Sequence, residues 1–337
     1  MRRRGIVATA VAGVLLATGA AALAGGLPLT GGGSSLERRP ENPFALPLIA
    51  VPDTPTARAA ETVQGDARRR MRRIARTPQA TWLLPEVYSA DRVGDEVARI
   101  GQLAVRADAV ALFVLYGISD RDCSGGYSAG GLPPQEYLAW ARRALDAAPA
   151  GHAVFVIEPD ALADAAGCAA DVRTQRTRLL ASVVDRAAHD DVAVYLDAGH
   201  SGWVDASTMA DLLRQAGVAR ARGFSLDVAN YRPTGGERRY GRRLVALLAD
   251  AGIADRHFVI DVGRNGAPDA PADFCNPPGR ALGVAPHGVD GDPSLDALLW
   301  IKPPAESDGT CQGGPPAGEI WVRRAVQMSR ERDRLHP

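Results

Sequence analysis

The stretch Ala153–Asp160, with the sequence AVFVIEPD, constrains the fold of this chain more than any other segment. Its five apolar residues, rich in β-branched and aromatic side chains, are typical of a strand that is covered on both faces. Pro159 lacks the N–H that a central ladder requires, so the strand must end there. We therefore expect Glu158 and Asp160 at the carboxyl end of a buried strand, where the active sites of parallel α/β proteins lie. A helix cap is the alternative role for Asp160.

Short apolar runs alternate with helical patterns from residue 53 onward. The predicted strands are Thr81–Leu84, Ala111–Tyr116, Ala153–Ile157, Ala193–Leu196, Gly223–Val228, His257–Val262 and Ala297–Ile301. The predicted helices cover residues 56–76, 90–106, 134–148, 171–189, 205–217, 237–252 and 319–334. This alternation favours an α/β fold with a parallel sheet and right-handed crossovers, which seven or eight such units can close into a barrel. An open doubly wound sheet is the alternative, but no G-x-G-x-x-G motif follows the first strand.

Residues 1–24 have the pattern of a signal peptide. Three arginines precede a long apolar run, and Ala22-Leu23-Ala24 fits a cleavage site of the A-x-A type. An uncleaved membrane anchor is the alternative, since the run barely reaches spanning length. Residues 25–40 are rich in Gly, Ser, Pro and Arg and are expected to form a flexible lead-in to a single domain at 41–337. The sequence thus predicts a secreted, extracellular protein with no stable membrane association after cleavage.

Composition excludes one large class of partner. The chain has 39 basic and 39 acidic residues and no basic stripe, so nucleic acid is not expected to bind. The hydrophobic fraction of 46% is enough for a substantial core, while the aromatic fraction of 5% limits the number of stacking platforms. Lys302 is the only lysine in a chain that otherwise uses arginine, so a specific role for it is expected.

Polar and aromatic side chains follow nearly every predicted strand. They include Tyr116, Arg121, Asp122, Glu158, Asp160, Asp197, His200, Trp203, Asp227, Asn230, Tyr231, Asp261, Arg264, Asn265, Lys302, Glu306 and Asp308. Helix capping explains single Asp residues at such positions, but not carboxylates that converge with Arg, Lys, His, Trp and Tyr on one rim. We interpret this rim as a catalytic mouth. Its mixture of aromatic faces and hydrogen-bonding groups suits a sugar polymer.

Several reaction classes are disfavoured by the motifs. No Ser-His-Asp order with a nucleophile elbow and no H-E-x-x-H helix is found. Asp197 and His200 alone are weak evidence for a metal, so neither a metal nor another cofactor is expected. Glycosidic cleavage needs one protonated and one ionised carboxyl group. Asp122 and Glu158, as like charges beside Asp160, could raise its pKa as an acid requires.

The four cysteines follow strands in two pairs. Export makes them candidates for disulfides, and four cysteines allow three pairings. Cys123 and Cys168 follow neighbouring strands, and so do Cys275 and Cys311. We therefore predict the disulfides Cys123–Cys168 and Cys275–Cys311.

Several motifs together resemble one known family. They are Asn42-Pro-Phe-Ala45, Tyr116-x-x-x-x-Arg121-Asp122-Cys123, Ile157-Glu-Pro-Asp160, Tyr195-Leu-Asp197-Ala-Gly-His200-x-Gly-Trp203, Asp261-x-x-Arg264-Asn265-Gly266, Cys275-Asn-Pro-Pro-Gly-Arg-Ala-Leu-Gly283 and Trp300-Ile-Lys302-Pro-Pro-x-Glu306-Ser-Asp308-Gly. In content and order they resemble the blocks of bacterial members of glycoside hydrolase family 6. That family contains endoglucanases and cellobiohydrolases, both of them cellulases.

The resemblance implies a distorted, incompletely closed, seven-stranded parallel β/α barrel of the TIM type, and hydrolysis of β-1,4-glucosidic bonds with inversion. By position, Asp160 would be the general acid, Asp122 would support it, and Asp308 would be the base, with a water relay as the alternative. The matching sugar-lining positions are Tyr116, Arg121, Asp197, His200, Trp203, Asn230, Lys302 and Glu306. Trp82, at the first strand, is assigned to the same set, with core packing as its alternative.

Two departures and the short loops refine this expectation. Gly117 and Phe274 stand where many relatives have Asn and Trp, and the second change would weaken one stacking subsite. Short connections favour an open cleft and internal cleavage of a β-1,4-glucan by a monomer. A cellobiohydrolase and a non-hydrolytic polysaccharide-binding protein are the alternatives.

Overall fold

The computed structural model describes residues 42–119, 130–189 and 192–337. In this part of the chain eight strands form one sheet in the order β1-β2-β3-β4-β5-β6-β8-β7. Their bounds are β1 Thr81–Leu83, β2 Ala111–Leu115, β3 Ala153–Ile157, β4 Ala193–Asp197, β5 Gly223–Leu226, β6 His257–Asp261, β7 His287–Gly288 and β8 Leu295–Leu299. Neighbours from β1 to β8 pair in parallel, and only the two-residue β7 is antiparallel.

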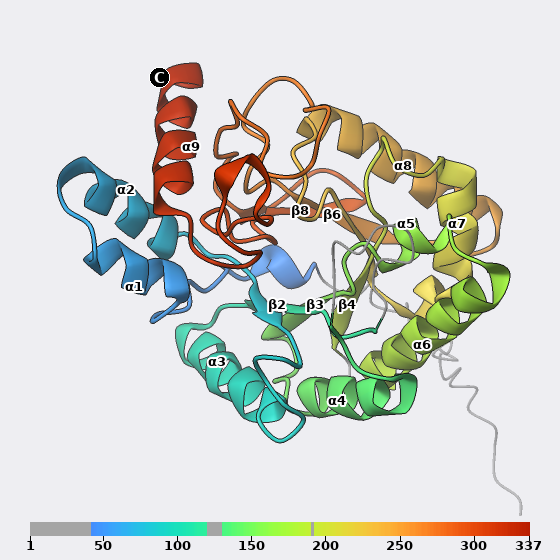
Figure 1. Ribbon diagram of the computed structural model, residues 1–337. Coiled ribbons are helices and arrows are strands. Elements are labelled where there is room, and N and C mark those ends of the chain that lie inside the picture. The colour runs from blue at the N-terminus through green and yellow to red at the C-terminus, as the bar shows by residue number, and fades with distance from the viewer. Residues whose placement is uncertain (1–41, 120–129, 190–191) are drawn as a thin grey trace, which may run out of the picture. The chain divides into compact units, whose positions relative to one another are not determined.

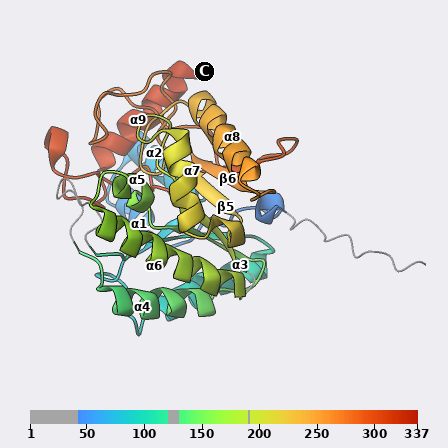
Figure 2. The same cartoon turned by 90° about the vertical axis from the view of Figure 1, so that its right-hand side faces the viewer.

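Helices surround the curled sheet (Figure 1). The α-helices are α1 Pro55–Glu61, α2 Gly65–Arg76, α3 Val93–Ala107, α4 Pro134–Asp146, α5 Ala161–Ala165, α6 Ala170–His189, α7 Ala206–Gln215, α8 Thr234–Asp250 and α9 Val322–Leu335. The described residues also form the short 3-10 helices η1 Pro43–Ala45, η2 Val218–Arg220 and η3 Cys311–Gly313. Figure 2 shows α4, α6, α7 and α8 following one another along one side of the sheet.

The barrel is not closed by a ladder. Across the seam between β1 and β8, Ala80 donates its N–H to the Trp300 carbonyl (3.0 Å), and the Trp82 indole donates to the Ile301 carbonyl (2.8 Å). No strand pairing joins β1 to β8 among the described residues. The predicted distorted, incompletely closed parallel barrel is confirmed.

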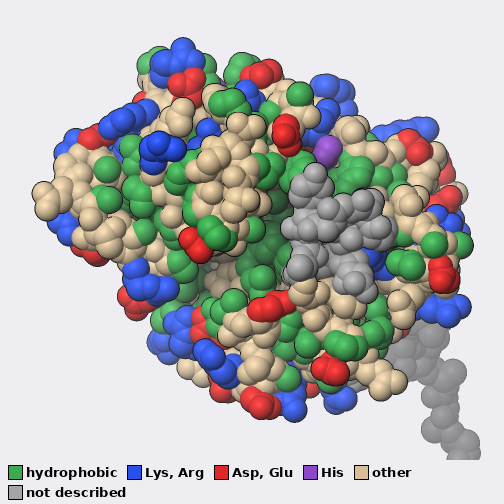
Figure 3. All heavy atoms as spheres, in the orientation of Figure 1, with side chains coloured by type: hydrophobic (Ala, Val, Ile, Leu, Met, Phe, Trp, Pro, Cys, Tyr) green, Lys and Arg blue, Asp and Glu red, His purple; other side chains and the backbone are tan. Residues whose placement is uncertain are grey.

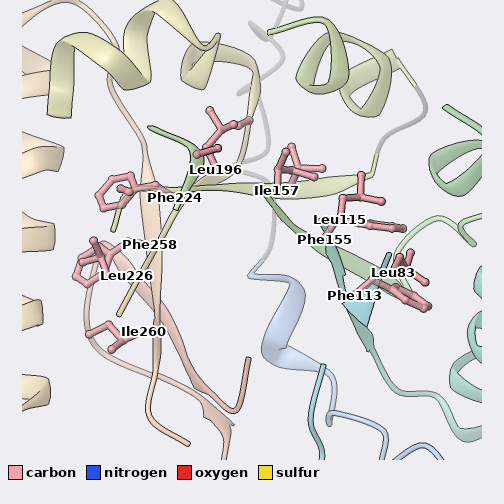
Figure 4. Packing of buried hydrophobic residues seen from close by; sticks show 14 of the residues in the cluster. Leu83, Phe113, Leu115, Phe155, Ile157, Leu196, Phe224, Leu226, Phe258 and Ile260 are labelled. Atoms are coloured by element: carbon pink, nitrogen blue, oxygen red, sulfur yellow. The ribbon is translucent and has the colours of Figure 1, made fainter. Parts of the chain in front are cut away.

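Both faces of the strands are buried. Alternate residues point outward against the helices, including the stacked pairs Phe113–Phe155 (5.0 Å between centroids) and Phe224–Phe258 (5.7 Å) (Figure 4). The residues between them point into the barrel, where Val114, Val156 and Tyr195 belong to a second apolar cluster. This two-sided burial is the reason that the strands read as continuous apolar runs.

A buried charge network lies at the amino-terminal end of the strands. The Asp296 carboxylate accepts hydrogen bonds from the Tyr195 hydroxyl (2.6 Å) and the Arg222 guanidinium (2.8 and 2.9 Å), and it lies 3.1 Å from His257 Nδ1. Asp296 occupies the position where the register of β6 and β8 shifts. Its partners explain how a carboxylate is tolerated inside a strand.

The differences from the predicted elements have local causes. The single helix predicted over 56–76 is two helices, because the chain leaves the helical path between Glu61 and Gly65, where Gln64 is extended and Gly65 has a left-handed φ of 59°. The short α5 and the two-residue β7 were not predicted, since neither has a periodic pattern long enough to detect. No helix among the described residues is long and apolar enough to cross a membrane.

Candidate active site

A cleft of about 1180 Å³ opens beside the carboxyl ends of the strands. Hydrophobic side chains line much of the hollow in this face, and acidic side chains lie at its rim (Figure 3). The cleft brings together most of the residues predicted for the site: Trp82, Tyr116, Asp160, His200, Trp203, Asn230, Lys302, Glu306 and Asp308. Arg121 and Asp122 lie outside the described residues.

Asp160 stands on a tight turn at the end of β3. Glu158 and Asp160 both have left-handed backbone angles, with φ of 49° and 71°, which are uncommon for residues other than glycine. Asp160 occupies the N-cap position of α5, but its side chain makes no capping hydrogen bond. Its backbone N–H donates to Asp197 Oδ2 (3.0 Å). The turn therefore presents the Asp160 carboxyl to the cleft and does not use it as a helix cap.

Glu158, the other carboxylate of this turn, is turned away from the cleft. It is 1% exposed and accepts the backbone N–H groups of Gly117 (2.7 Å) and Ile118 (3.2 Å). It therefore holds the beginning of the loop that follows β2, whereas the sequence had placed two carboxylates at the mouth. Burial with these two donors explains the difference, because a buried carboxylate needs hydrogen-bond partners.

Asp197 lies beneath the cleft and not in its lining. Its Oδ2 accepts the N–H groups of Asp160 and Gly199 (both 3.0 Å), and its Oδ1 accepts the Ser225 hydroxyl (2.9 Å). Burial, only partly offset by these hydrogen bonds, raises the pKa of Asp197 to about 7. The geometry of this predicted substrate-binding residue is that of a support for the Asp160 turn.

The turn after β4 carries an aromatic platform. Trp203 is 41% exposed, and its ring centroid lies 5.6 Å from that of His200. A Cβ at Gly199 would stand 2.8 Å from Ala163 and 3.4 Å from the Trp203 ring, so only glycine fits there. Burial and the nearby Arg232 charge lower the pKa of His200 to about 4, which leaves the imidazole neutral near neutral pH. A neutral imidazole and an exposed indole suit contact with a sugar.

This platform is anchored from the α8 side. Glu237, which is fully buried in the first turn of α8, accepts the N–H and hydroxyl of Ser201. Arg232 donates to the same hydroxyl (3.2 Å), and its guanidinium lies where a Cβ at Gly202 would stand, 2.5 Å away. Sequence reasoning missed Glu237 because nothing in a helical pattern marks one acidic residue as the partner of a distant loop.

The opposite wall combines two aromatic rings with an ion pair. Trp82 and Tyr116 meet edge to face at 5.2 Å. Lys302 Nζ lies 4.9 Å from the Trp82 ring centre and 2.8 Å from Glu306 Oε2. Trp82, whose role the sequence left open, therefore lines the cleft. A compact ammonium held between a ring and a carboxylate can bond sugar hydroxyls from several directions.

Both carboxylate oxygens of Asp308 are bound by other side chains or backbone groups of the protein. Its Oδ1 pairs with Arg264 (2.7 Å), while its Oδ2 accepts the Tyr231 hydroxyl (2.7 Å) and the Asn276 N–H (3.0 Å). Burial favours the neutral acid, but Arg264, the Tyr231 hydroxyl and Lys302 outweigh it and lower the pKa of Asp308. A carboxylate with these partners is ionised but is a poor acceptor for a further proton.

The predicted disulfide Cys275–Cys311 is confirmed. It joins the connection before β7 to the loop after β8, next to Asn276, whose amide donates to the Gly309 carbonyl (2.8 Å) and accepts the Asp308 N–H (3.0 Å). The other predicted bridge, Cys123–Cys168, stays a prediction because Cys123 lies outside the described residues. Asn276 was quoted within a motif but was not singled out.

Comparison with known proteins identifies the family of this chain. The sequence profile of glycosyl hydrolases family 6 matches residues 48–332. The chain belongs to this family. Family 6 relatives include Endoglucanase A of Cellulomonas fimi, 37% identical over 279 residues (83% of this chain, 60% of that protein), and Endoglucanase 1 of Streptomyces halstedii, 36% identical over 290 residues (83% and 88%). This chain thus spans less than two thirds of the Cellulomonas relative.

A solved family 6 structure is also similar. It is the endoglucanase Cel6 from Mycobacterium tuberculosis in complex with methyl-cellobiosyl-4-deoxy-4-thio-β-D-cellobioside, with a TM-score of 0.79 and 39% sequence identity. The match covers 86% of this chain and 99% of that chain. The resemblance stated from the sequence motifs is therefore confirmed at the level of family and fold.

In this family 6 chain the cleft places the Asp160 carboxyl group between two walls that carry aromatic rings. Asp160 lines it, with Trp82 and Lys302 on one side and His200 and Trp203 on the other. No group of three or more His, Cys, Asp or Glu residues is arranged to hold a metal ion within the described ranges. A carboxyl group beside indole rings, an ammonium group and an imidazole can chemically donate a proton and contact a sugar.

Proposed function

We propose that this protein is a secreted, inverting endo-β-1,4-glucanase that cleaves internal bonds of cellulose-like glucans. The observation that carries the proposal is the placement of Asp160 in a cleft walled by Trp82 with Lys302 and by His200 with Trp203. The relatives named endoglucanase, and the thio-oligosaccharide complex of one of them, support the same substrate class.

In this mechanism Asp160 protonates the departing glycosidic oxygen. Asp122 supports it, modulating its pKa and assisting proton movement, and Asp197 holds its backbone. Water attacks the opposite face of the sugar ring. Because both oxygens of Asp308 are engaged, we favour a chain of waters that carries the proton of the attacking water to solvent over direct proton transfer to Asp308, and Asp308 then stabilises charge near the attacking water.

Internal cleavage is favoured by the lengths of the connections. Only residues 166–169 separate α5 from α6, and only residues 262–294, which contain β7, separate β6 from β8. Short connections at these two places favour an open cleft. A cellobiohydrolase, which acts from a chain end, is the alternative within the same family. A binding protein without turnover is disfavoured because Asp160 and Asp122 are both present.

The same proposal includes export and a single catalytic domain. Residues 1–24 are assigned as a signal peptide, 25–40 as a lead-in and 41–337 as the catalytic domain, acting as a monomer on a glucan. Amino-terminal sequencing of the protein recovered from culture medium tests the first assignment. A start near residue 25 is expected, and an intact residue 1 in a membrane fraction would favour the anchor.

Viscometry of carboxymethyl cellulose tests the activity. We expect a steep fall in viscosity for each reducing end that is released, because an internal cut halves a long chain. Cellobiose as the dominant product from the first minutes would instead favour the exo-acting alternative. Binding of cellohexaose without release of reducing ends would favour the binding protein.

A further inference from the structure

Asp261, the last residue of β6, collects four backbone hydrogen bonds on one buried carboxylate. Its Oδ1 accepts the N–H groups of Gly263 (3.0 Å) and Ile301 (3.2 Å), and its Oδ2 accepts those of Lys302 (2.9 Å) and Ala229 (3.2 Å). The side chain is 3% exposed and does not line the cleft. Asp261 therefore serves no direct contact with substrate in this site.

The four donors come from three different connections. Ala229 follows β5, Gly263 follows β6, and Ile301 and Lys302 follow β8. In the sheet β6 lies between β5 and β8, and Figure 1 shows β6 beside β8. A carboxylate on the middle strand thus ties together the loops of its two neighbours.

Both tied loops carry cleft residues. Lys302 itself lines the cleft, and Ala229 precedes Asn230, which also lines it. Ala229 has a left-handed φ of 60°, and its carbonyl accepts a hydrogen bond from Arg264 while its N–H donates to Asp261. Both polar groups of this residue are therefore held by the segment that follows β6, which fixes the direction in which Asn230 leaves it.

Among the side chains of this size, only a carboxylate can accept all four of these N–H groups. Each of its two oxygens accepts two N–H groups, whereas an asparagine would offer one oxygen and turn an NH₂ donor toward the other two N–H groups. Glu158 and Asp197 make comparable bonds to the loops after β2 and β3. Within the described part of the chain, Asp261 differs from them in joining the loops of the strands on both of its sides.

We propose that Asp261 is a positioning residue that sets where Asn230 and Lys302 stand relative to each other, and so determines how well the cleft binds a glucan. The inference rests on the proposed function of the cleft. It adds a residue that acts through two others and touches no sugar.

The first test is Asp261→Asn, with cellohexaose as substrate. We expect KM to rise about tenfold or more and kcat to change less, since misplacement of binding groups by fractions of an ångström weakens binding. The matched control is Asp296→Asn, which removes the charge of another buried aspartate at the opposite end of the barrel. That variant should lower Tm and leave KM within about twofold of the wild-type value.

A second variant tests the same proposal if Asp261→Asn fails to fold. A Cβ at Gly263 would lie 3.1 Å from the Lys302 carbonyl and 3.3 Å from Asp261 Oδ1, so Gly263→Ala presses on the same junction without removing the carboxylate. Its KM should rise in the same direction by a smaller factor. An unchanged KM in every folded variant, or an equal rise in Asp296→Asn, would overturn the proposal.

Binding measurements separate this inference from the proposed function. Calorimetry with cellohexaose compares Asp160→Ala with the double variant Asp160→Ala/Asp261→Asn, so no turnover interferes. A weaker affinity in the double variant supports positioning even if the wild-type protein releases no reducing ends, an outcome that would refute the enzyme assignment alone. Equal affinities would refute positioning alone.

Discussion

At the scale of single residues, the proposed function assigns to Asp160 the proton donation that separates cleavage from binding alone. Replacing it with Ala should lower the rate on cellohexaose about 10²- to 10⁴-fold, because proton donation to the leaving oxygen is lost. Binding should be nearly intact, since Trp82, Lys302, His200 and Trp203 are untouched. Reducing-end assays and calorimetry measure the two quantities.

A substrate whose leaving group needs little protonation provides the control for the role of Asp160. A dinitrophenyl cellobioside releases a stable phenolate and needs little protonation, so the Asp160→Ala variant should lose far less activity on it than on cellohexaose. Equal losses on both substrates would contradict an acid role. More than about a tenth of the wild-type rate on cellohexaose would contradict it as well.

Asp197 makes a separate prediction about pH. Burial raises the pKa of this carboxyl to about 7, whereas in the unfolded chain it titrates near ~3.9. Between these values the folded protein holds a proton that the unfolded chain has released. The linked stabilisation is complete below about pH 3.9 and is lost as pH rises through about 7.

The variant Asp197→Asn cannot titrate and should not lose that stabilisation. Relative to wild type, its free energy of unfolding should rise by about 2–3 kcal/mol between about pH 5 and pH 8. Urea unfolding at several pH values measures the difference. Parallel curves for the two proteins would show that Asp197 titrates normally in the folded state.

The sequence predicted some of these residues and not others, for physical reasons. Pro159 ends a buried strand, so Asp160 could be placed at the mouth from the sequence alone. Glu158 and Asp197 also sit at strand ends, yet both face backbone N–H groups. Such a carboxylate is either exposed to solvent or hydrogen-bonded to a neighbouring loop. The outcome depends on residues far away in the chain, so a local sequence pattern cannot predict it.

At the scale of elements, the strands were predictable because they are buried on both faces. β3 has the predicted bounds Ala153–Ile157, and the other predicted strands differ from the observed ones by a few residues at their ends. β8 begins two residues earlier than predicted, at Leu295, because Asp296 forms an ion pair with Arg222, the residue before β5. A charged residue in the sequence predicts the end of a buried strand, because the distant partner that compensates its charge is not visible in the local pattern.

The disulfide Cys275–Cys311 offers a test at this scale. It closes a loop with a sequence separation of 36 residues. Replacing both cysteines with Ser should lower the free energy of unfolding by about 4 kcal/mol in the chain-entropy model. Activity should fall too, because Asn276, next to Cys275, holds Asp308.

Urea unfolding of the double Ser variant, without reductant, measures the effect of this bridge alone. Wild-type protein in reductant is the comparison, since it loses every accessible disulfide. A loss of less than about 1 kcal/mol would mean that the hydrogen bonds of Asn276 hold the two loops together without the bridge.

At the scale of the whole molecule, the barrel places the two carboxyl groups of the proposed mechanism on different, non-adjacent loops. Asp160 follows β3 and Asp308 follows β8, and these strands are not neighbours in the sheet. Carboxyl groups from such distant loops leave room for water, as an inverting mechanism requires. Hydrolysis of a β-linked substrate should therefore give the α-anomer first.

Proton NMR during the first turnovers on cellohexaose reads the anomer directly, before mutarotation. Product that has been left to mutarotate to equilibrium calibrates the signals of both anomers. Initial β-anomer would imply a covalent intermediate with a closer carboxylate pair. The roles given to Asp308 and to the water relay would then have to be abandoned.

The first described residues pack at the end of the barrel opposite the cleft. Asn42 donates to the Asp296 carbonyl (2.9 Å), and the Phe44 ring lies 6.1 Å from that of Tyr195, both at the amino ends of the strands. The cleft opens at their carboxyl ends. A bead or a carrier protein joined directly at residue 42 would therefore attach to the face opposite the cleft and leave the cleft open to an insoluble substrate.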